Sequence, residues 1–83
     1  MKYILTRHAK DILGERAIPV EWLERTLNNP ERIEPDRVDA DLEHRLGRIT
    51  EHGNRVLRVV LKKNVRPMWV VTVYFDRAMR SKL

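Results

Sequence analysis

The chain has 83 residues, no cysteine, 35% charged residues and a formal net charge of +5. A chain of this length forms one domain, residues 1–83, without room for a buried cofactor, and its lack of cysteine excludes disulfides, thiolate catalysis and Cys-based zinc sites. Because no apolar run approaches the length of a signal-peptide core or a membrane span, we expect a cytoplasmic protein with no cofactor and no membrane contact.

The N-terminal third predicts a short strand followed by two helices. Residues 2–5 can form the strand, and the Thr6 hydroxyl can cap a helix over residues 7–16. Pro19 suits the first position of a second helix, which Asn28-Asn29-Pro30 ends. Apolar residues recur at helical spacing in both segments: Ala9, Ile12 and Leu13 in the first, and Val20, Leu23 and Leu27 in the second.

Strands account for most of the remaining chain. Residues 31–43 are acidic and interrupted by Pro35, which predicts an irregular segment with one short edge strand at residues 32–34. Longer strands follow over residues 42–50, 55–63 and 68–76, separated by turns. Strands adjacent in sequence most simply form an antiparallel meander. We therefore expect an α+β fold in the order β-α-α-β-β-β-β, with both helices on one face of a mainly antiparallel sheet.

Side-chain alternation predicts which residues each face of the sheet carries. The helices should cover Leu57, Val59 and Leu61 of one strand and Trp69, Val71, Val73 and Phe75 of the next. The opposite face should then be open and carry Arg58, Lys62, Thr72 and Tyr74. Either Arg45 or Arg48 of the preceding strand can join them, but not both. The same parity exposes Val56, Val60, Met68 and Val70, a patch that a partner or a second copy would bury in a homo-oligomer.

Basic residues are concentrated at the C-terminal end of the chain. Residues 54–83 hold eight Lys/Arg against one acid, a charge of +7, whereas residues 1–53 hold nine Lys/Arg and eleven Asp/Glu, a charge of −2. A basic sheet face on a small protein favours a polyanion partner, most commonly nucleic acid. The alternative is a solvated surface with surplus basic residues.

Five short motifs occur in order along the chain: Thr6-Arg7-His8-Ala9, Glu15-Arg16-x-Ile18, Arg45 on a strand, Leu57-Arg58-Val59-Val60 and Val71-Thr72-Val73-Tyr74. This order resembles a bacterial and archaeal family of small proteins catalogued as a domain of unknown function. Its members open with a His-Ala helix and close with a Thr-Val-Tyr strand. That family in turn resembles the RelE- and BrnT-like toxins of type II toxin–antitoxin pairs, small basic ribonucleases neutralised by a partner protein. The chain departs from the family at Ile12, where members often carry an Arg.

The resemblance implies a RelE-like fold and a metal-independent endoribonuclease. Such toxins place Arg, Lys and Tyr on the open sheet face, where they stabilise phosphorane-like charge and transfer protons. Arg58 would clamp the scissile phosphate, Lys62 would follow the backbone, and Tyr74 would stack on a base or transfer a proton. The implied partners are RNA, with ribosome-bound mRNA as one candidate, and a small antitoxin protein. The residues carried over are Arg58, Tyr74, His8 and Arg45 as catalytic and Lys62, Lys63, Arg77 and Arg80 as RNA-binding.

Each of these assignments has a structural alternative. His8 in an amphipathic helix can be a packing residue, and Tyr74 can be an ordinary cross-strand aromatic. We interpret Arg16 as structural, paired with a nearby acid, and assign no role to His44 or His52.

The acids of residues 36–43 could hold Mg²⁺ in principle, but their irregular segment favours a solvated linker or an antitoxin contact. The three His have no zinc-ligand spacing. Two other functions stay open for the same face: a non-catalytic nucleic-acid-binding module, and a domain that binds an acidic segment of a partner protein.

Overall fold

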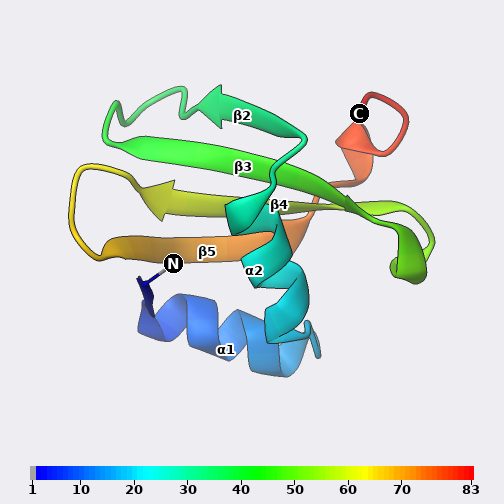
Figure 1. Ribbon diagram of the computed structural model, residues 1–83, viewed down its shortest axis with the longest axis horizontal. Helices are drawn as coiled ribbons and strands as arrows, with labels where there is room; N and C mark the ends of the chain where they lie inside the picture. The colour runs from blue at the N-terminus through cyan, green and yellow to red at the C-terminus, as the bar shows by residue number, and fades with distance from the viewer. Residues whose placement is uncertain (1) are drawn as a thin grey trace.

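The computed structural model describes residues 2–83 as two helices against a five-stranded, mainly antiparallel sheet (Figure 1). The order along the chain is the expected β-α-α-β-β-β-β, with a 3-10 turn before β4 and another after β5. The elements are β1 Tyr3–Leu5, α1 Arg7–Glu15, α2 Val20–Asn28, β2 Arg32–Pro35, β3 Leu42–Ile49, η1 Thr50–His52, β4 Arg55–Lys62, β5 Met68–Phe75 and η2 Arg77–Met79.

The sheet has the strand order β1-β5-β4-β3-β2. Strands β2 to β5 form the expected antiparallel meander, and β1 adds in parallel beside the first residues of β5. Because β1 pairs only with Met68–Val70, the rest of the β5 edge has no strand beside it within residues 2–83. Helix α1 runs along this edge (Figure 1).

Helix α1 begins at the predicted residue, and α2 begins one residue later than predicted, because Pro19 is its N-cap and not its first helical residue. The Thr6 hydroxyl accepts the backbone N–H of Ala9 at 3.1 Å, which caps α1, and Pro19 precedes the first turn of α2. The two helices bury Ala9 and Leu13, and Leu23 and Leu27, in one core cluster with the inner face of the sheet. Val20, predicted for the buried stripe of α2, is instead 47% exposed because it lies in the first turn, beyond the sheet contact.

A β-bulge in β5 changes which of its residues face the helices. Val60 pairs with Thr72 but Leu61 pairs with Val70, so Val71 is an extra residue and the alternation shifts there. Val73 and Phe75 face the core as predicted, whereas Trp69 does not: it turns to the outer face and is 45% exposed. Met68 and Val70 take its place in the core cluster.

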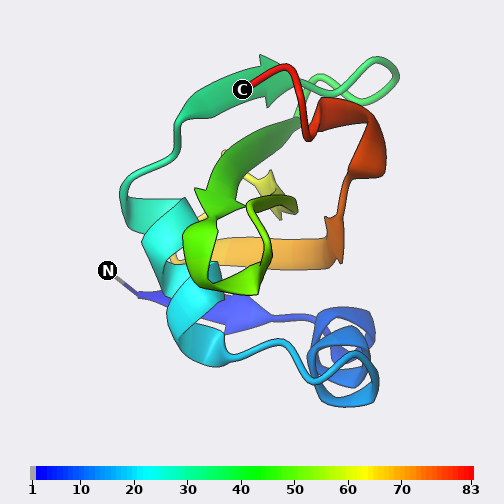
Figure 2. The same ribbon diagram turned by 90° about the vertical axis from the view of Figure 1, so that its right-hand side faces the viewer.

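The outer face of the sheet, opposite α2, is partly covered by the C-terminal segment. Figure 2 shows η2 and the last residues on the side of the sheet away from α2. Met79 and Leu83 pack there on Leu46 and Val56, and Val60 is also buried. The expected open apolar patch of Val56, Val60, Met68 and Val70 is therefore wrong, and with it disappears that reason to expect a second copy of the chain.

Candidate nucleic-acid interface

Arg58 lies at the centre of a buried ionic cluster on the outer face. Its side chain is largely buried, its Nε donates to Asp76 Oδ2 at 2.8 Å, and its Nη2 lies 2.8 Å from the same oxygen in an ion pair. Its Nη1 donates to Glu34 Oε1 at 3.0 Å and to His44 Nδ1 at 2.8 Å. Burial opposes the charge of Arg58, but the hydrogen bonds to Glu34 and Asp76 outweigh it and raise its pKa. We call Arg58, Glu34, His44, Asp36 and Asp76 the Arg58 cluster.

His44 links the Arg58 cluster to the loop before β3. Because Arg58 can only donate, His44 Nδ1 is the acceptor and its proton lies on Nε2, 2.7 Å from Asp36 Oδ1. The Asp36 carboxylate also accepts the backbone N–H groups of Val38 and Asp39. Backbone donation by Asp39, the His44 contact and backbone donation by Val38 together lower the pKa of Asp36 from 3.8 to about 2.

These contacts change the expectation for Arg58 as a phosphate clamp. Arg58 shares the outer face with Tyr74 and Thr72, as parity predicts. Its guanidinium is, however, already bound by two carboxylates, and the side chain is 10% exposed, so it is not free to bind a phosphate in this structure. The alternation of side chains predicted the face on which Arg58 lies. It did not predict the carboxylate partners, Glu34 of β2 and Asp76 after β5.

Arg45 lies on the opposite face of the sheet from Arg58. It pairs with Val59, donates from Nη1 to the Leu27 carbonyl at the end of α2, and donates from Nε to Glu43. A catalytic site shared by Arg45 and Arg58 is therefore incompatible with the structure, because the sheet separates the two side chains. Arg48 is the arginine of β3 on the outer face, where it donates to the Leu83 carbonyl.

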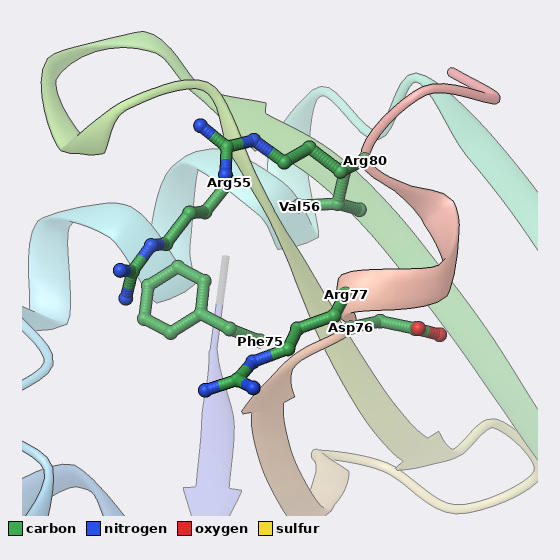
Figure 3. Close-up of a pocket in the computed structure, with 6 residues that line it drawn as sticks. All are labelled: Arg55, Val56, Phe75, Asp76, Arg77 and Arg80. Atoms are coloured by element: carbon green, nitrogen blue, oxygen red, sulfur yellow. The ribbon is translucent and has the colours of Figure 1, made fainter.

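Three other arginines come together at the end of the sheet where β4 begins and β5 ends. Arg55 opens β4, and Arg77 and Arg80 belong to η2 and the residue that follows it. They line a pocket of about 370 Å³ together with Val56, Phe75 and Asp76. Figure 3 shows the three arginine side chains extending to one side of the pocket, with the Phe75 ring between those of Arg55 and Arg77.

A second pocket of about 480 Å³ continues the first. It shares Arg55, Phe75 and Arg77 and reaches Arg16 at the end of α1. Its floor is the free edge of β5, from Thr72 to Phe75. We call the two pockets together the arginine groove; its cations are Arg16, Arg55, Arg77 and Arg80.

The charges of the arginine groove are not neutralised by any carboxylate of residues 2–83. None of the ion pairs found within residues 2–83 involves any of its four arginines. Arg80 donates to the Gly53 carbonyl at 2.9 Å, and Arg55 lies 3.5 Å from His52 Nε2. Asp76, the acid next to Arg77 in the chain, points its carboxylate away from Arg55, Arg77 and Arg80 (Figure 3), toward Arg58. The groove can therefore bind an anionic ligand without first breaking an internal ion pair.

Hydroxyl and imidazole groups lie beside the arginine groove. His8, in the first turn of α1, places its Nε2 3.1 Å from the Thr72 hydroxyl. Thr72 and Tyr74 both line the groove, and the Tyr74 ring is 44% exposed. His8 is thus exposed to solvent, and its Nε2 contacts the Thr72 hydroxyl of β5. It does not contact a backbone carbonyl through this nitrogen, as a packing histidine would.

The remaining predicted residues lie elsewhere. Lys62 is on the outer face at the opposite end of β4 from the groove, and Lys63 follows it in the turn. His52, assigned no role from the sequence, lines the second pocket of the arginine groove and packs between Trp22 and Phe75, with ring-centroid distances of 5.1 and 5.0 Å. Within residues 2–83 no group of three or more His, Asp or Glu is arranged to hold a metal ion, and no helix is long and apolar enough to cross a membrane.

Sequence reasoning missed two cations of the groove. Arg16 was expected to pair with an acid of its own helix, but it makes no such pair and faces the pocket. Arg55 was counted only in the basic surplus. The signal available was that surplus itself, since residues 54–83 contain far more arginine than acid to pair with it.

The chain belongs to a protein family described as a domain of unknown function (DUF4258), whose family model matches residues 5–75. The match includes the His8 turn, all of β4 and all of β5. It ends before η2, so two of the four groove arginines, Arg77 and Arg80, lie outside the matched segment. No curated protein and no solved structure matches the chain.

Proposed function

We propose that this protein is the toxin of a type II toxin–antitoxin pair, a metal-independent endoribonuclease with a RelE-like fold that binds cytoplasmic RNA in the arginine groove. The observation that carries the proposal is the convergence of four unneutralised arginines on one groove beside Tyr74, Thr72 and His8. The RelE-like arrangement is supported by two helices on one mainly antiparallel sheet.

RNA suits the groove better than a small anion does. Guanidinium groups bind phosphate through paired N–H donors, and several arginines in a row match the repeating phosphates of a nucleic acid backbone. The arginines extend from Arg16 on α1 to Arg80 after η2, across two joined pockets. The exposed Tyr74 ring at the groove offers a stacking surface for a base, which single-stranded RNA can supply.

The side chains beside the groove suit RNA cleavage by phosphoryl transfer to the neighbouring 2′-hydroxyl. In this reaction the 2′-oxygen bonds to phosphorus and the bond from phosphorus to the 5′-oxygen breaks, which leaves a 2′,3′-cyclic phosphate and a 5′-hydroxyl end. A base takes the 2′-proton and an acid protonates the leaving 5′-oxygen. We assign the proton transfers to His8 and Tyr74 and the stabilisation of phosphorane charge to Arg16 and Arg77.

An antitoxin would act by covering the same surface. A small acidic protein that places carboxylates in the arginine groove would neutralise its cations and exclude RNA. RNA and the antitoxin are then competitors for one site. The acidic loop of residues 36–41 is not needed for this contact, because Asp36 is already bonded to His44 and to the loop backbone.

Induced expression in a bacterial host tests the proposal. Wild-type protein should arrest growth and generate new RNA ends that carry 2′,3′-cyclic phosphate. The Arg55→Ala, Arg77→Ala double variant should lose both effects while keeping its fold, since both side chains are exposed. Arg37→Ala removes an exposed arginine from the β2–β3 loop, away from the groove, and should behave as wild type.

Binding measurements with the purified protein separate cleavage from recognition. A 2′-O-methyl RNA lacks the attacking hydroxyl, so it should bind without being cut. Binding without cleavage of ordinary RNA would reduce the protein to a non-catalytic RNA-binding module. If wild type neither binds RNA nor generates new ends, the proposal is wrong, and an acidic protein becomes the better ligand for the groove.

A further inference from the structure

Trp69 is an exposed aromatic residue at the opposite end of β5 from the arginine groove. The β5 bulge turns it to the outer face, where its strand partners are Lys62 of β4 and Ile4 of β1. Trp69 and Ile4 are among the most exposed large apolar residues of the chain. The position is specified by the strand register, because removal of the bulge would return this side chain to the core.

The environment of Trp69 differs from that of the other tryptophan. Trp22 packs against His52 and Phe75, whereas none of the ring–ring contacts within residues 2–83 involves Trp69. A half-exposed indole that packs on no other ring presents a flat apolar face to solvent. Such side chains are concentrated at binding sites, because they contribute a large contact area at little loss of conformational freedom.

The charges around Trp69 favour nucleic acid over an acidic or neutral protein surface. Lys62 lies beside it on the sheet, and Lys63 and Arg66 lie in the turn that leads into β5. The acid at this turn, Asp41, accepts the Asn64 side-chain amide at 2.9 Å. Cations that flank an exposed aromatic ring are the pattern of single-strand binding sites, in which bases stack and basic groups follow the phosphates.

Trp69 and the arginine groove lie along one line of the sheet. Thr72 and Tyr74 follow Trp69 on the outer face of β5, and Tyr74 already lines the groove. At about 3.3 Å per residue, the five steps from Trp69 to Tyr74 span roughly 16 Å. A strand with stacked bases advances about 3.4 Å per nucleotide, so this span corresponds to roughly four or five nucleotides.

We infer that Trp69, with Ile4 and Lys62, forms a second RNA subsite, a base-stacking platform that makes single-stranded RNA of several nucleotides the preferred ligand. The inference rests on the proposed function, since it requires RNA in the arginine groove. RNA then runs along the outer face of β5, with its phosphates at Arg55 and Arg77 and a base on the Trp69 ring. Short RNA occupies the groove alone, and longer RNA reaches both subsites.

Length-dependent binding to 2′-O-methyl oligouridylates of two and eight nucleotides tests this subsite. Trp69→Ala should weaken octamer binding about tenfold, within the range known for loss of one stacked base, and should leave dimer binding unchanged. Trp69→Phe keeps an aromatic ring and should retain most of the octamer affinity. Val20→Ala, a change at an exposed apolar residue of α2 on the other side of the sheet, is the matched control.

Tryptophan fluorescence gives an independent readout of the same contact. The octamer should quench the wild-type signal, and the quench should disappear in Trp69→Phe, in which Trp22 is the only tryptophan left. The inference is overturned if the octamer causes no quench, or if Trp69→Ala binds both oligomers as wild type does. In that case loss of binding in the Arg55→Ala, Arg77→Ala variant would still support the arginine groove as the RNA site. Unchanged binding in both variants would instead remove the proposed function as well.

Discussion

The Arg58 cluster and the arginine groove are two arginine sites close together on the sheet, and they differ in what surrounds the guanidinium groups. Arg58 is buried and bound to Asp76 and Glu34, whereas the groove arginines are exposed and have no carboxylate partner within residues 2–83. A buried, paired arginine contributes to the stability of the fold, because its removal leaves buried carboxylates without a cation. An exposed, unpaired arginine is available for a ligand.

Asp76 contacts both regions: it pairs with Arg58 and caps the turn that carries Arg77 and Arg80. Its Oδ2 accepts a hydrogen bond from Arg58 Nε and forms an ion pair with Nη2, and its Oδ1 accepts the backbone N–H of Ala78, which caps η2. The cap helps fix the turn that carries Arg77 and Arg80. One carboxylate therefore neutralises the buried arginine and helps position Arg77 and Arg80, although Asp76 itself also lines the first pocket of the groove.

The largest expected effect is the loss of stability in Arg58→Ala. This change leaves the partly buried Asp76 carboxylate without its cation and removes one of the two cations of Glu34, which stays paired with Arg32, so the free energy of unfolding should fall by about 2 to 4 kcal/mol. Urea unfolding followed by circular dichroism measures it. Arg58→Lys keeps the charge but not the paired donors and should fall between alanine and wild type. A stability of Arg58→Ala equal to that of wild type would show that the cluster is not structural.

Substitution of the groove arginines should weaken RNA binding and leave the stability of the protein nearly unchanged. Arg55→Ala combined with Arg77→Ala should change the free energy of unfolding by less than about 0.5 kcal/mol, because both side chains are exposed. The slope of log affinity for RNA against log salt should become shallower by about 0.7 for each phosphate that the variant no longer binds. Titrations at three salt concentrations give this slope. A salt dependence identical to that of wild type would place the RNA phosphates elsewhere.

Substitutions of Asp76 should have a smaller effect on stability, and they test whether this carboxylate positions the groove arginines of η2. Asp76→Asn can still cap η2 through its side-chain oxygen but loses the ion pair with Arg58, so stability should fall by about 1 to 2 kcal/mol with RNA affinity nearly kept. Asp76→Ala loses the cap as well and should also bind RNA more weakly. If both variants bind RNA equally well, the position of η2 does not depend on this carboxylate.

The smallest expected effect is a pH dependence that arises from Asp36. Its pKa is lowered to about 2 by backbone donation from Asp39, the contact with His44 and backbone donation from Val38. Its contribution to stability is therefore complete above the ordinary value of 3.8 and is lost as the pH falls toward 2. Asp36→Asn should narrow the difference between urea midpoints at pH 7 and pH 3. Equal differences in the variant and wild type would assign the acid sensitivity to other groups.

Local sequence signals predicted the elements well because they act within a few residues. The Thr6 cap, the Asn29-Pro30 stop and the alternation of β4 each depend on immediate neighbours, and the structure reproduces all three. The bulge at Val71 is different, since an extra residue in one strand leaves no mark in the apolar pattern of Trp69 to Phe75. Trp69 consequently moved from predicted core residue to exposed surface.

The amino-acid sequence by itself determined the α+β order of elements, the two helices and the concentration of positive charge in the last thirty residues. Tertiary structure alone decided which of those charges remain free. Arg58 meets Glu34, 24 residues away, and Asp76, 18 residues away, only because β2, β3, β4 and the end of β5 come together on one face. Ion pairing depends on distance in space, and strands far apart in the chain supply the partners. The same register leaves Arg16, Arg55, Arg77 and Arg80 without a carboxylate partner in the part of the chain that the structure describes, residues 2–83.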